Sequence, residues 1–147
     1  GGRADIMRQV APLGSVYQAG TLSGNPIAVA AGTAMLRHIK RHPEISAQLE
    51  ARGEQLTGAL ESNPPPGVTV NRVGAMFTLF FTSSRVTDWD SAKTSDTQRF
   101  AKYFHFLLER GIYLAPSQFE AAFLSTAHSE ADIQHTVEAA RDFFSLQ

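Results

Sequence analysis

The first part of the chain follows a helical pattern of small and apolar residues. Residues 26–42 are predicted to form a helix, because Asn25 can cap its first turn and Pro26 fits the first helical position. Gly32 lies inside this helix and disfavours it by about 1 kcal/mol relative to Ala, so we expect Gly32 to pack closely against another element. Upstream, residues 3–11 are compatible with a short helix, and the stretch that follows, rich in Gly and Pro, predicts a loop.

A second helix and two strands are predicted downstream of Pro43. The helix has one apolar stripe, and the Pro-rich run at residues 63–67 ends it. Residues 68–70 and 76–81 are rich in β-branched and aromatic side chains, which is typical of strands. Residues 83–94 are polar and predict a loop. The apolar stripe of the helix consists of Ile45, Leu49, Leu56 and Leu60.

The last third of the chain predicts two more helices and two short strands. Ser95 and Gln98 have the spacing of a capping box before a helix with apolar positions in residues 100–108. Ser129 should cap a final helix. The two short strands are predicted at residues 112–114 and 123–125. The order of elements predicts an α+β fold, in which long helices lead into a small antiparallel sheet with helices on one face.

Composition narrows the classes of function. The 147 residues include 13 Lys and Arg and 14 Asp and Glu, a net charge of −1 that gives no general attraction to nucleic acid or anionic lipid. The absence of cysteine excludes disulfides and thiol chemistry. No apolar stretch approaches the roughly 18 residues of a membrane span, so we expect a cytoplasmic protein without a membrane partner.

The chain has many apolar residues and few charged ones. Apolar residues make up 43% of the chain and charged residues only 18%, against roughly 25% charged in typical soluble domains. We therefore expect part of the apolar surface to face another domain or subunit. The chain starts with Gly1 instead of Met, so we also expect that residue 1 is not the biological start.

The segment from Gly20 to Pro26 has the composition of an anion site. Its glycines allow backbone N–H groups to approach a phosphate, and its hydroxyl groups can donate hydrogen bonds to it. The dipole of the helix that follows adds attraction for a negative charge. An ordinary loop with a helix cap is the alternative interpretation of the same residues, since isolated Gly-rich loops are weak evidence.

Glu120 is the second candidate for a functional residue. It follows Ser117 and Gln118 in a polar run and is surrounded in the sequence by alanine and phenylalanine. A carboxylate in such a segment must be paired, protonated or facing a cleft. A loop Glu that bonds to the nearby backbone is the structural alternative.

His38 and His42 are spaced as metal ligands can be on one helix. The residues between them include Lys40 and Arg41, whose charges oppose a metal ion, and the Glu of the metalloprotease motif is missing. We therefore predict a solvated, positively charged helix end and no metal site.

Ser125, His128 and Asp132 contain the residue types of a catalytic triad. Residues this close on one loop and one helix start rarely converge on a substrate, and the sequence has no nucleophile-elbow pattern. Ser129 and Asp132 are better explained as residues that start a helix.

Four stretches of the chain carry a family resemblance. They are Tyr17–Pro26, Gly74–Phe77, Asp96–Phe100 (after Lys93) and Gly111–Ala121, of which the last is the most specific. In this order they resemble the part downstream of the cofactor lysine in the glutamate-1-semialdehyde 2,1-aminomutase family. These are class III, fold-type-I pyridoxal-phosphate enzymes. The resemblance covers essentially the whole chain and implies the C-terminal portion of such an enzyme.

The resemblance implies a reaction and roles for individual residues. The family converts glutamate-1-semialdehyde into the tetrapyrrole precursor 5-aminolevulinate, with pyridoxal 5'-phosphate and pyridoxamine 5'-phosphate as cofactor forms. Thr21, with the Gly20 backbone beside it, matches the position that contacts the cofactor phosphate of the neighbouring subunit, which implies a homodimer. Glu120 matches a residue near the substrate, and Ser117 and Gln118 are neighbours with weaker claims.

One expected group is missing from the sequence. Catalysis of this kind needs a lysine that bonds to the cofactor, and the only lysines are Lys40, Lys93 and Lys102. None lies in a context similar to the family's cofactor lysine, so the resemblance implies that this lysine lies upstream of Gly1. We therefore expect no catalytic residue in this chain and no activity from it alone.

The resemblance also implies a domain organisation. Residues 1–25 would end the large cofactor domain and carry the phosphate-contact loop, residues 26–62 would be connecting helices, and residues 63–147 would form the small α+β domain.

Two alternative interpretations of the function remain. One is a class III ω-amino-acid aminotransferase, and the other is a non-catalytic interaction module that keeps the fold.

Overall fold

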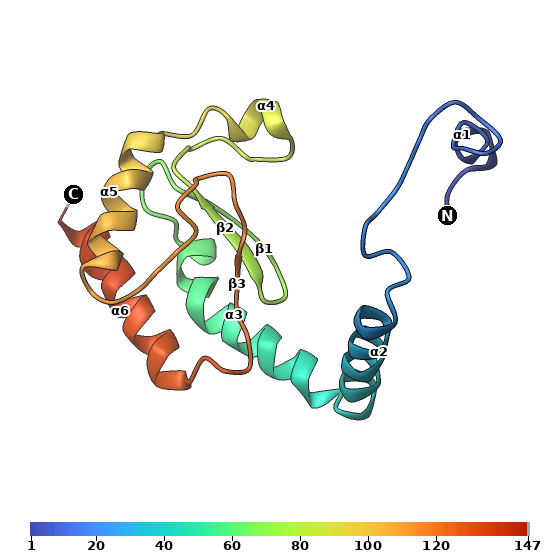
Figure 1. Cartoon of the computed structure of the whole chain (residues 1–147). Helices are drawn as coiled ribbons and strands as arrows, with labels where there is room; N and C mark the ends of the chain where they lie inside the picture. Colours follow the sequence, from blue (N-terminus) through green and yellow to red (C-terminus); the bar gives the residue numbers. More distant parts are fainter. Residues whose placement is uncertain (147) are drawn as a thin grey trace. The chain divides into compact units, whose positions relative to one another are not determined.

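The computed structural model describes residues 1–146 and has two compact units, Gly1–His42 and Pro43–Gln147. Figure 1 shows the elements of both, and they are called the N-terminal and the C-terminal unit below. The C-terminal unit contains a three-stranded antiparallel sheet and the helices around it, which confirms the predicted α+β class. None of the helices in the described part of the chain is long and apolar enough to cross a membrane.

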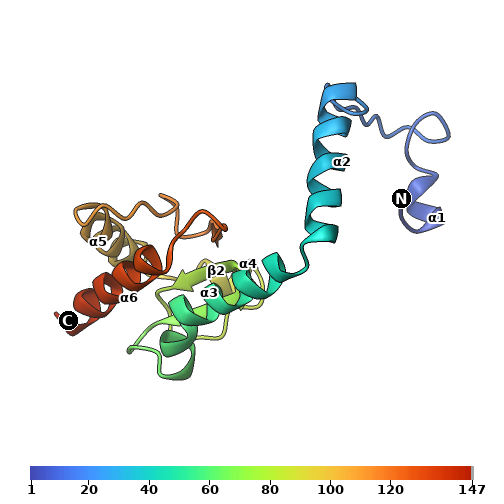
Figure 2. The ribbon, with the colours of Figure 1, turned by 90° about the horizontal axis from the view of Figure 1, so that it is seen from below.

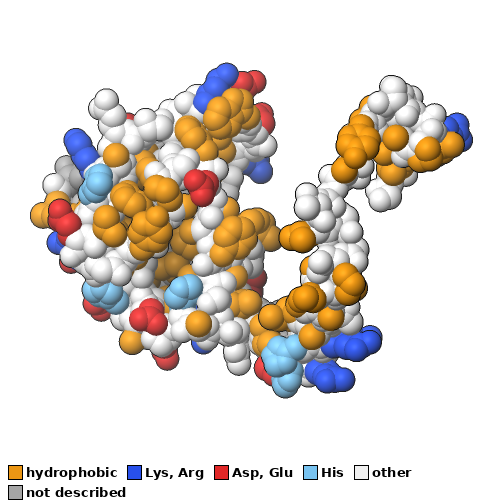
Figure 3. Space-filling model, viewed as in Figure 1, with side chains coloured by type: hydrophobic (Ala, Val, Ile, Leu, Met, Phe, Trp, Pro, Cys, Tyr) orange, Lys and Arg blue, Asp and Glu red, His pale blue; other side chains and the backbone are white. Residues whose placement is uncertain are grey.

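The N-terminal unit consists of two helices and the loop between them. Helix α1 spans Ala4–Met7, shorter than the predicted 3–11, and α2 spans Pro26–Arg41. The predicted helix start is confirmed, because the Asn25 Oδ1 accepts hydrogen bonds from the N–H groups of Ile27 and Ala28 at 3.0 and 3.1 Å. No residue of this unit is buried, and hydrophobic side chains lie on the surface of α2 (Figure 3).

The expected close packing at Gly32 is absent from the described residues. A Cβ atom at this position would meet no atom within 4 Å. The destabilising effect of glycine in a helix is therefore not offset by a backbone contact within the described part of the chain.

The C-terminal unit begins with a long helix and a hairpin. Helix α3 spans Glu44–Ser62, and strands β1 (Thr69–Val73) and β2 (Met76–Phe80) pair antiparallel with Val70 opposite Leu79. Strand β3 (Ala122–Phe123) adds to the other edge of β2, where Met76 pairs with Phe123. Helix α3 packs against β1 and β2, and a Cβ at Gly53 would overlap the carbonyl oxygen of Gly74. The absence of a side chain at Gly53 therefore allows the hairpin turn to approach the helix.

Two C-terminal helices complete the core of this unit. Helix α5 (Thr97–Leu108) packs against α6 (Glu130–Ser145), and α6 packs against α3, as Figures 1 and 2 show. Their aromatic side chains meet the sheet at Phe81, which has edge contacts with the rings of Phe100, Tyr103 and Phe143. The buried core consists of Val68, Leu79, Phe81, Phe100, Tyr103, Leu107, Ala139, Ala140 and Phe143.

A second, smaller cluster of buried side chains lies on the other face of β2. Phe80 points away from its neighbour Leu79, as expected for successive strand residues, and packs with Val86 and Ala92. Ala92 belongs to the short helix α4 (Trp89–Ala92), which lies within the stretch predicted as a loop. That prediction was wrong at α4 because Asp88 and Ser91 form a capping box in a polar segment whose only buried helical residue is Ala92.

Two further local predictions were wrong. The N-cap of α5 is Asp96, which accepts hydrogen bonds from the N–H groups of Gln98 and Arg99, whereas the Ser95 hydroxyl is buried without a partner among the described residues. Residues 112–114 form no strand. The N–H of Ile112 instead donates to the Leu107 carbonyl at 3.0 Å and closes the end of α5. The last predicted strand is present but is shifted to Ala122–Phe123.

Arg72 joins the hairpin to α3. Its side chain is 12% exposed, and its nitrogens contact one carboxylate oxygen each of Glu50, Glu54 and Glu61 at 2.6, 2.5 and 2.8 Å. Glu61 also accepts a hydrogen bond from the Thr57 hydroxyl. These contacts form one network between the surface of α3 and the end of β1 near the hairpin turn.

Candidate functional site

The turn before α2 contains the first two predicted site residues. The Ser23 N–H donates to the Gly20 carbonyl at 2.9 Å, and the Asn25 N–H donates to the Leu22 carbonyl at 3.0 Å. Gly24 has φ +75°, a left-handed conformation that glycine adopts without strain. The chain therefore makes a tight double turn that leads directly into the first turn of α2.

Several donors of this turn are unused. Thr21 is exposed, and neither its hydroxyl nor the N–H groups of Gly20, Thr21 and Leu22 donate to another described residue. The first N–H groups of α2, by contrast, are already bonded to Asn25. A phosphate would therefore be held by the turn itself and only assisted by the helix dipole. This donor set fits the phosphate of a cofactor.

The loop before β3 contains the other predicted site residues, Ser117, Gln118 and Glu120. The Ser117 hydroxyl accepts from the Phe119 N–H at 3.2 Å, and the Ser117 carbonyl accepts from the Glu120 N–H at 3.2 Å. Gln118 points inward and is 3% exposed, with its Nε2 donating to the Leu79 carbonyl at 2.7 Å. Three successive polar residues thus have different surroundings: Ser117 is half-buried, Gln118 buried and Glu120 exposed.

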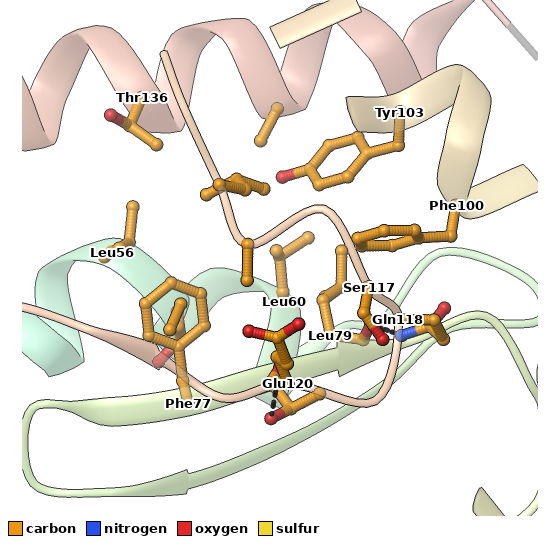
Figure 4. A pocket seen from close by; sticks show the side chains of 16 residues that line it. Leu56, Leu60, Phe77, Leu79, Phe100, Tyr103, Ser117, Gln118, Glu120 and Thr136 are labelled. Atoms are coloured by element: carbon orange, nitrogen blue, oxygen red, sulfur yellow. Dashed lines mark hydrogen bonds between the residues drawn. The ribbon is translucent and has the colours of Figure 1, made fainter. Parts of the chain in front are cut away.

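Glu120 lies beside a pocket between α3, β2, α5 and α6 (Figure 4). Of the three environments expected for this carboxylate, the structure shows a side chain that lines a cleft. The carboxylate has no ion pair or hydrogen bond to another described residue. Most of the pocket wall is apolar and includes Leu56, Leu60, Phe77, Leu79 and Phe100. An acidic group beside an apolar wall suits a ligand that presents an amino group.

Tyr103 and Thr78 are pocket residues that the sequence patterns did not single out. Tyr103 is 5% exposed, its hydroxyl has no hydrogen-bond partner among the described residues, and burial raises its pKa well above the ordinary value. The Thr78 hydroxyl lies 3.5 Å from the Glu120 carbonyl oxygen. Thr78 is the lone hydroxyl of an apolar strand, and Tyr103 lies at an apolar position of the helical pattern, which gives no sign of a site in the sequence.

The three lysines are all exposed. Lys93 pairs with Asp90, with 2.6 Å between Nζ and Oδ1, and Lys102 lies on the outer face of α5. Neither Lys93 nor Lys102 lines the pocket beside Glu120. The residues present therefore fit the phosphate of the cofactor and leave its covalent attachment unexplained.

The remaining candidate residues lie in a helix end, a turn and a helix cap. His38 belongs to the basic last turn of α2, and no group of three or more possible metal ligands occurs in the described residues. The Ser125 N–H donates to the Nδ1 of His128 at 3.0 Å within a turn. Ser129 and Asp132 form the capping box of α6, and hydrogen bonds from Ser129 lower the pKa of Asp132. The prediction that these two residues start a helix is confirmed.

Comparison with known proteins confirms the resemblance along the whole chain. The chain is 52% identical to the glutamate-1-semialdehyde 2,1-aminomutase of Persephonella marina over 98% of its length. It is 54% identical to that of Roseiflexus castenholzii over 97%, and 53% identical to that of Thermus thermophilus over 95%. The matches cover 34%, 33% and 34% of these relatives, so the chain spans about a third of their length. No family model matches the sequence.

Solved structures support the same fold. A β-phenylalanine aminotransferase from Variovorax paradoxus matches 99% of the chain and 34% of its own length, with a TM-score of 0.71 and 27% identity. An ω-transaminase from Sphaerobacter thermophilus matches with the same coverages, a TM-score of 0.64 and 22% identity. The latter likeness concerns the fold alone.

Proposed function

We propose that these 147 residues are the C-terminal part of a glutamate-1-semialdehyde 2,1-aminomutase. The observation that carries this proposal is the identity of about half of all residues, over nearly the whole chain, to enzymes of that name. The complete protein would convert glutamate-1-semialdehyde to 5-aminolevulinate by moving an amino group within one molecule. When bound, pyridoxal 5'-phosphate would supply the electron sink for this transfer.

In this proposal, the turn at Gly20 and Thr21 holds the cofactor phosphate of a partner subunit. The unused N–H groups of the turn and the Thr21 hydroxyl are the donors, and the exposure of Thr21 leaves them accessible to another chain. The complete enzyme would therefore be a homodimer in which each site borrows this turn from its neighbour.

Glu120 is the proposed contact for the substrate. Its carboxylate is exposed beside the pocket and has no partner among the described residues, so it is free to accept hydrogen bonds from an amino group. Ser117 lines the same pocket and could assist in orienting the substrate. The cofactor lysine would come from a part of the enzyme outside these residues.

The phosphate role is tested by substituting Thr21 in the complete enzyme. Thr21→Val removes the hydroxyl with little change in size, and we expect the cofactor to dissociate about tenfold more readily, since a hydrogen bond to a charged group is lost. Thr21→Ser should retain the cofactor, and Thr87→Val, at an exposed position in the other unit, is the matched control. Unchanged retention in Thr21→Val would refute the role of this turn and favour an interaction module.

The 147-residue chain provides a second test of the proposal. We expect it neither to bind the cofactor covalently nor to turn over glutamate-1-semialdehyde, because its three lysines are exposed and none belongs to the pocket. Borohydride reduction in the presence of pyridoxal 5'-phosphate, followed by peptide mapping, would detect a specific bond. Specific labelling of Lys40, Lys93 or Lys102 would contradict the proposal.

An ω-amino-acid aminotransferase is the second candidate, favoured by the structural likeness to the β-phenylalanine aminotransferase. That likeness comes with 27% identity, against 52% for the aminomutase of Persephonella marina. The two reactions differ in their need for a second amino compound. Turnover of glutamate-1-semialdehyde as the sole substrate would exclude the aminotransferase.

A further inference from the structure

Gln118 is anchored inside the C-terminal unit although it lies two residues before the exposed Glu120. Its Nε2 donates to the carbonyl oxygen of Leu79 at 2.7 Å, and Figure 4 shows this bond below the pocket. Leu79 belongs to β2, whose backbone is fixed by pairing with β1. The bond therefore ties the loop to a rigid strand.

Stability alone does not explain a glutamine at this position. The Oε1 atom of Gln118 is buried and has no hydrogen-bond partner among the described residues. A buried oxygen without a partner is unfavourable, and an apolar side chain of similar length would avoid this penalty. The arrangement is better explained by the direction that the single Nε2 bond gives to the loop.

Among the hydrogen bonds from side chains between this loop and β2, the second one is weaker. The Thr78 hydroxyl approaches the Glu120 carbonyl oxygen at 3.5 Å, the long limit of a hydrogen bond. The hydrogen bonds that Ser117 accepts from the N–H groups of Phe119 and Glu120 stay within the loop and shape a turn without attaching it to the sheet. Pairing of β3 with β2 fixes the chain after Glu120. The bond from Gln118 to Leu79 fixes it before Glu120, so the Glu120 carboxylate is placed at the pocket from both sides.

We propose that Gln118 is a positioning residue that holds Glu120 at the mouth of the pocket and does not itself contact the substrate. Gln118 belongs to the wall of the same pocket, but its donor is already bonded to Leu79 and its oxygen is shielded from solvent. This inference rests on the proposed function, because it assumes that Glu120 contacts the amino-bearing substrate. It predicts that Gln118 affects turnover only through Glu120.

A double-mutant cycle in the complete enzyme tests this dependence. Glu120→Gln should lower kcat/KM for glutamate-1-semialdehyde by about 10- to 100-fold, the effect of losing a hydrogen bond to a charged group. Gln118→Met keeps the length of the side chain but removes the donor, and should lower kcat/KM about tenfold, mainly through KM. The double variant should stay within about threefold of Glu120→Gln alone, because the two residues act in series.

The outcomes separate the two hypotheses. An unchanged kcat/KM in Glu120→Gln would refute the substrate role of Glu120 and, with it, the positioning role of Gln118. The positioning role alone would be overturned by a different result. In that result Glu120→Gln lowers kcat/KM as expected, and the loss in the double variant equals the product of the two single losses. Non-additive losses support both.

Asn71→Leu is the matched control for a loss of stability. The Asn71 Nδ2 donates to the Val86 carbonyl at 2.9 Å, so this substitution also removes an amide-to-carbonyl bond from a strand to a loop. This bond leads to Val86 and not to the loop of Glu120. We expect a lower melting temperature with normal kcat/KM, and an equal loss of kcat/KM in Asn71→Leu would overturn a specific role for Gln118.

A conservative variant distinguishes positioning from folding. Burial should keep the new carboxyl group in Gln118→Glu protonated at neutral pH, so that its O–H can still donate to Leu79. We expect kcat/KM close to that of the unchanged enzyme near neutral pH and a loss as the pH rises and this group ionises. The same loss at every pH, as in Gln118→Met, would contradict a role for the donor, and folding of both variants is checked by circular dichroism.

Discussion

The two units differ in how they use their apolar residues. Every buried side chain of the described chain belongs to the C-terminal unit. The N-terminal unit is rich in apolar residues too, but along α2 they are exposed: Ile27, Val29, Met35, Leu36 and Ile39. Helix α2 is nevertheless well capped and as long as α6, with 16 residues in each.

This contrast separates local structure from stability. Capping and helix-forming residues are sufficient to define where α2 begins and ends, but burial of apolar area provides most of the stability of a fold. The C-terminal unit has such a core, and the N-terminal unit does not. We therefore expect substitutions of the same kind to have very different effects in the two units.

A matched pair of leucines provides the strongest test. Leu107 in α5 is 0% exposed and Leu36 in α2 is 69% exposed. Leu107→Ala should lower the free energy of unfolding by about 3 to 4 kcal/mol, through lost burial and a new cavity. Leu36→Ala should change it by no more than about 0.5 kcal/mol. Urea unfolding of the 147-residue chain measures both, and similar losses would show that α2 has a core contact of its own.

Arg72 makes three ion pairs that a single substitution removes from the C-terminal unit. Arg72→Met deletes three ion pairs and should lower the free energy of unfolding, by an amount limited by the exposure of Glu50 and Glu54. Glu50→Gln removes one exposed partner and should cost about 0.5 kcal/mol or less. Equal losses in the two variants would mean that the network does not act through Arg72.

The pH dependence of the free energy of unfolding tests whether Glu61 is coupled to Arg72. Burial alone would raise the pKa of Glu61, but hydrogen bonds from Thr57 and Arg72 bring it below its ordinary value of 4.5. The unfolded chain therefore takes up this proton at a higher pH than the folded chain, so stability falls as the pH drops below about 4.5. The fall should be shallower in Arg72→Met, and an unchanged slope would exclude Glu61 as the coupled group.

The difference between the units also explains which predictions from sequence succeeded. The start of α2 at Pro26 and the capping of α6 by Ser129 depend on neighbouring residues only, and both were predicted correctly. The strand expected at residues 112–114 was wrong, because a strand needs a partner and Ile112 bonds to the end of α5 instead. The cap of α5 was misplaced by one residue because Ser95 and Asp96 are both good caps and tertiary packing buries Ser95.

The candidate site follows the same rule. The residue pattern predicted a loop at Thr21, and a position at a cleft was one of the environments that it left open for Glu120. That Gln118 turns inward toward Leu79, and that Tyr103 brings a hydroxyl into the pocket, depends on how α5 and the loop meet the sheet. Contacts between segments far apart in the sequence were not predictable from spacing.

Helix caps give a smaller effect that still separates the units. Ser129→Ala should lower the free energy of unfolding of the C-terminal unit by about 1 kcal/mol, because α6 is part of its core. Asn25→Ala removes the equivalent cap from α2 and should reduce helical circular dichroism without shifting the unfolding midpoint followed by the fluorescence of Trp89. A shifted midpoint in Asn25→Ala would show that the folding of the two units is coupled.

Tyr103→Phe should have a small effect on stability, of the opposite sign to the effects of Leu107→Ala and Ser129→Ala. The Tyr103 ring is part of the aromatic core, but its hydroxyl is removed from bulk water without a hydrogen-bond partner among the described residues. Phenylalanine keeps the ring contacts and avoids the desolvation of the hydroxyl, so we expect the free energy of unfolding to rise by about 0.5 to 1 kcal/mol. Phe100→Leu, which removes a core ring of the same cluster, should instead be destabilising by about 1 kcal/mol. A loss of stability in Tyr103→Phe would show that the hydroxyl has a bound partner in the pocket, such as an ordered water molecule.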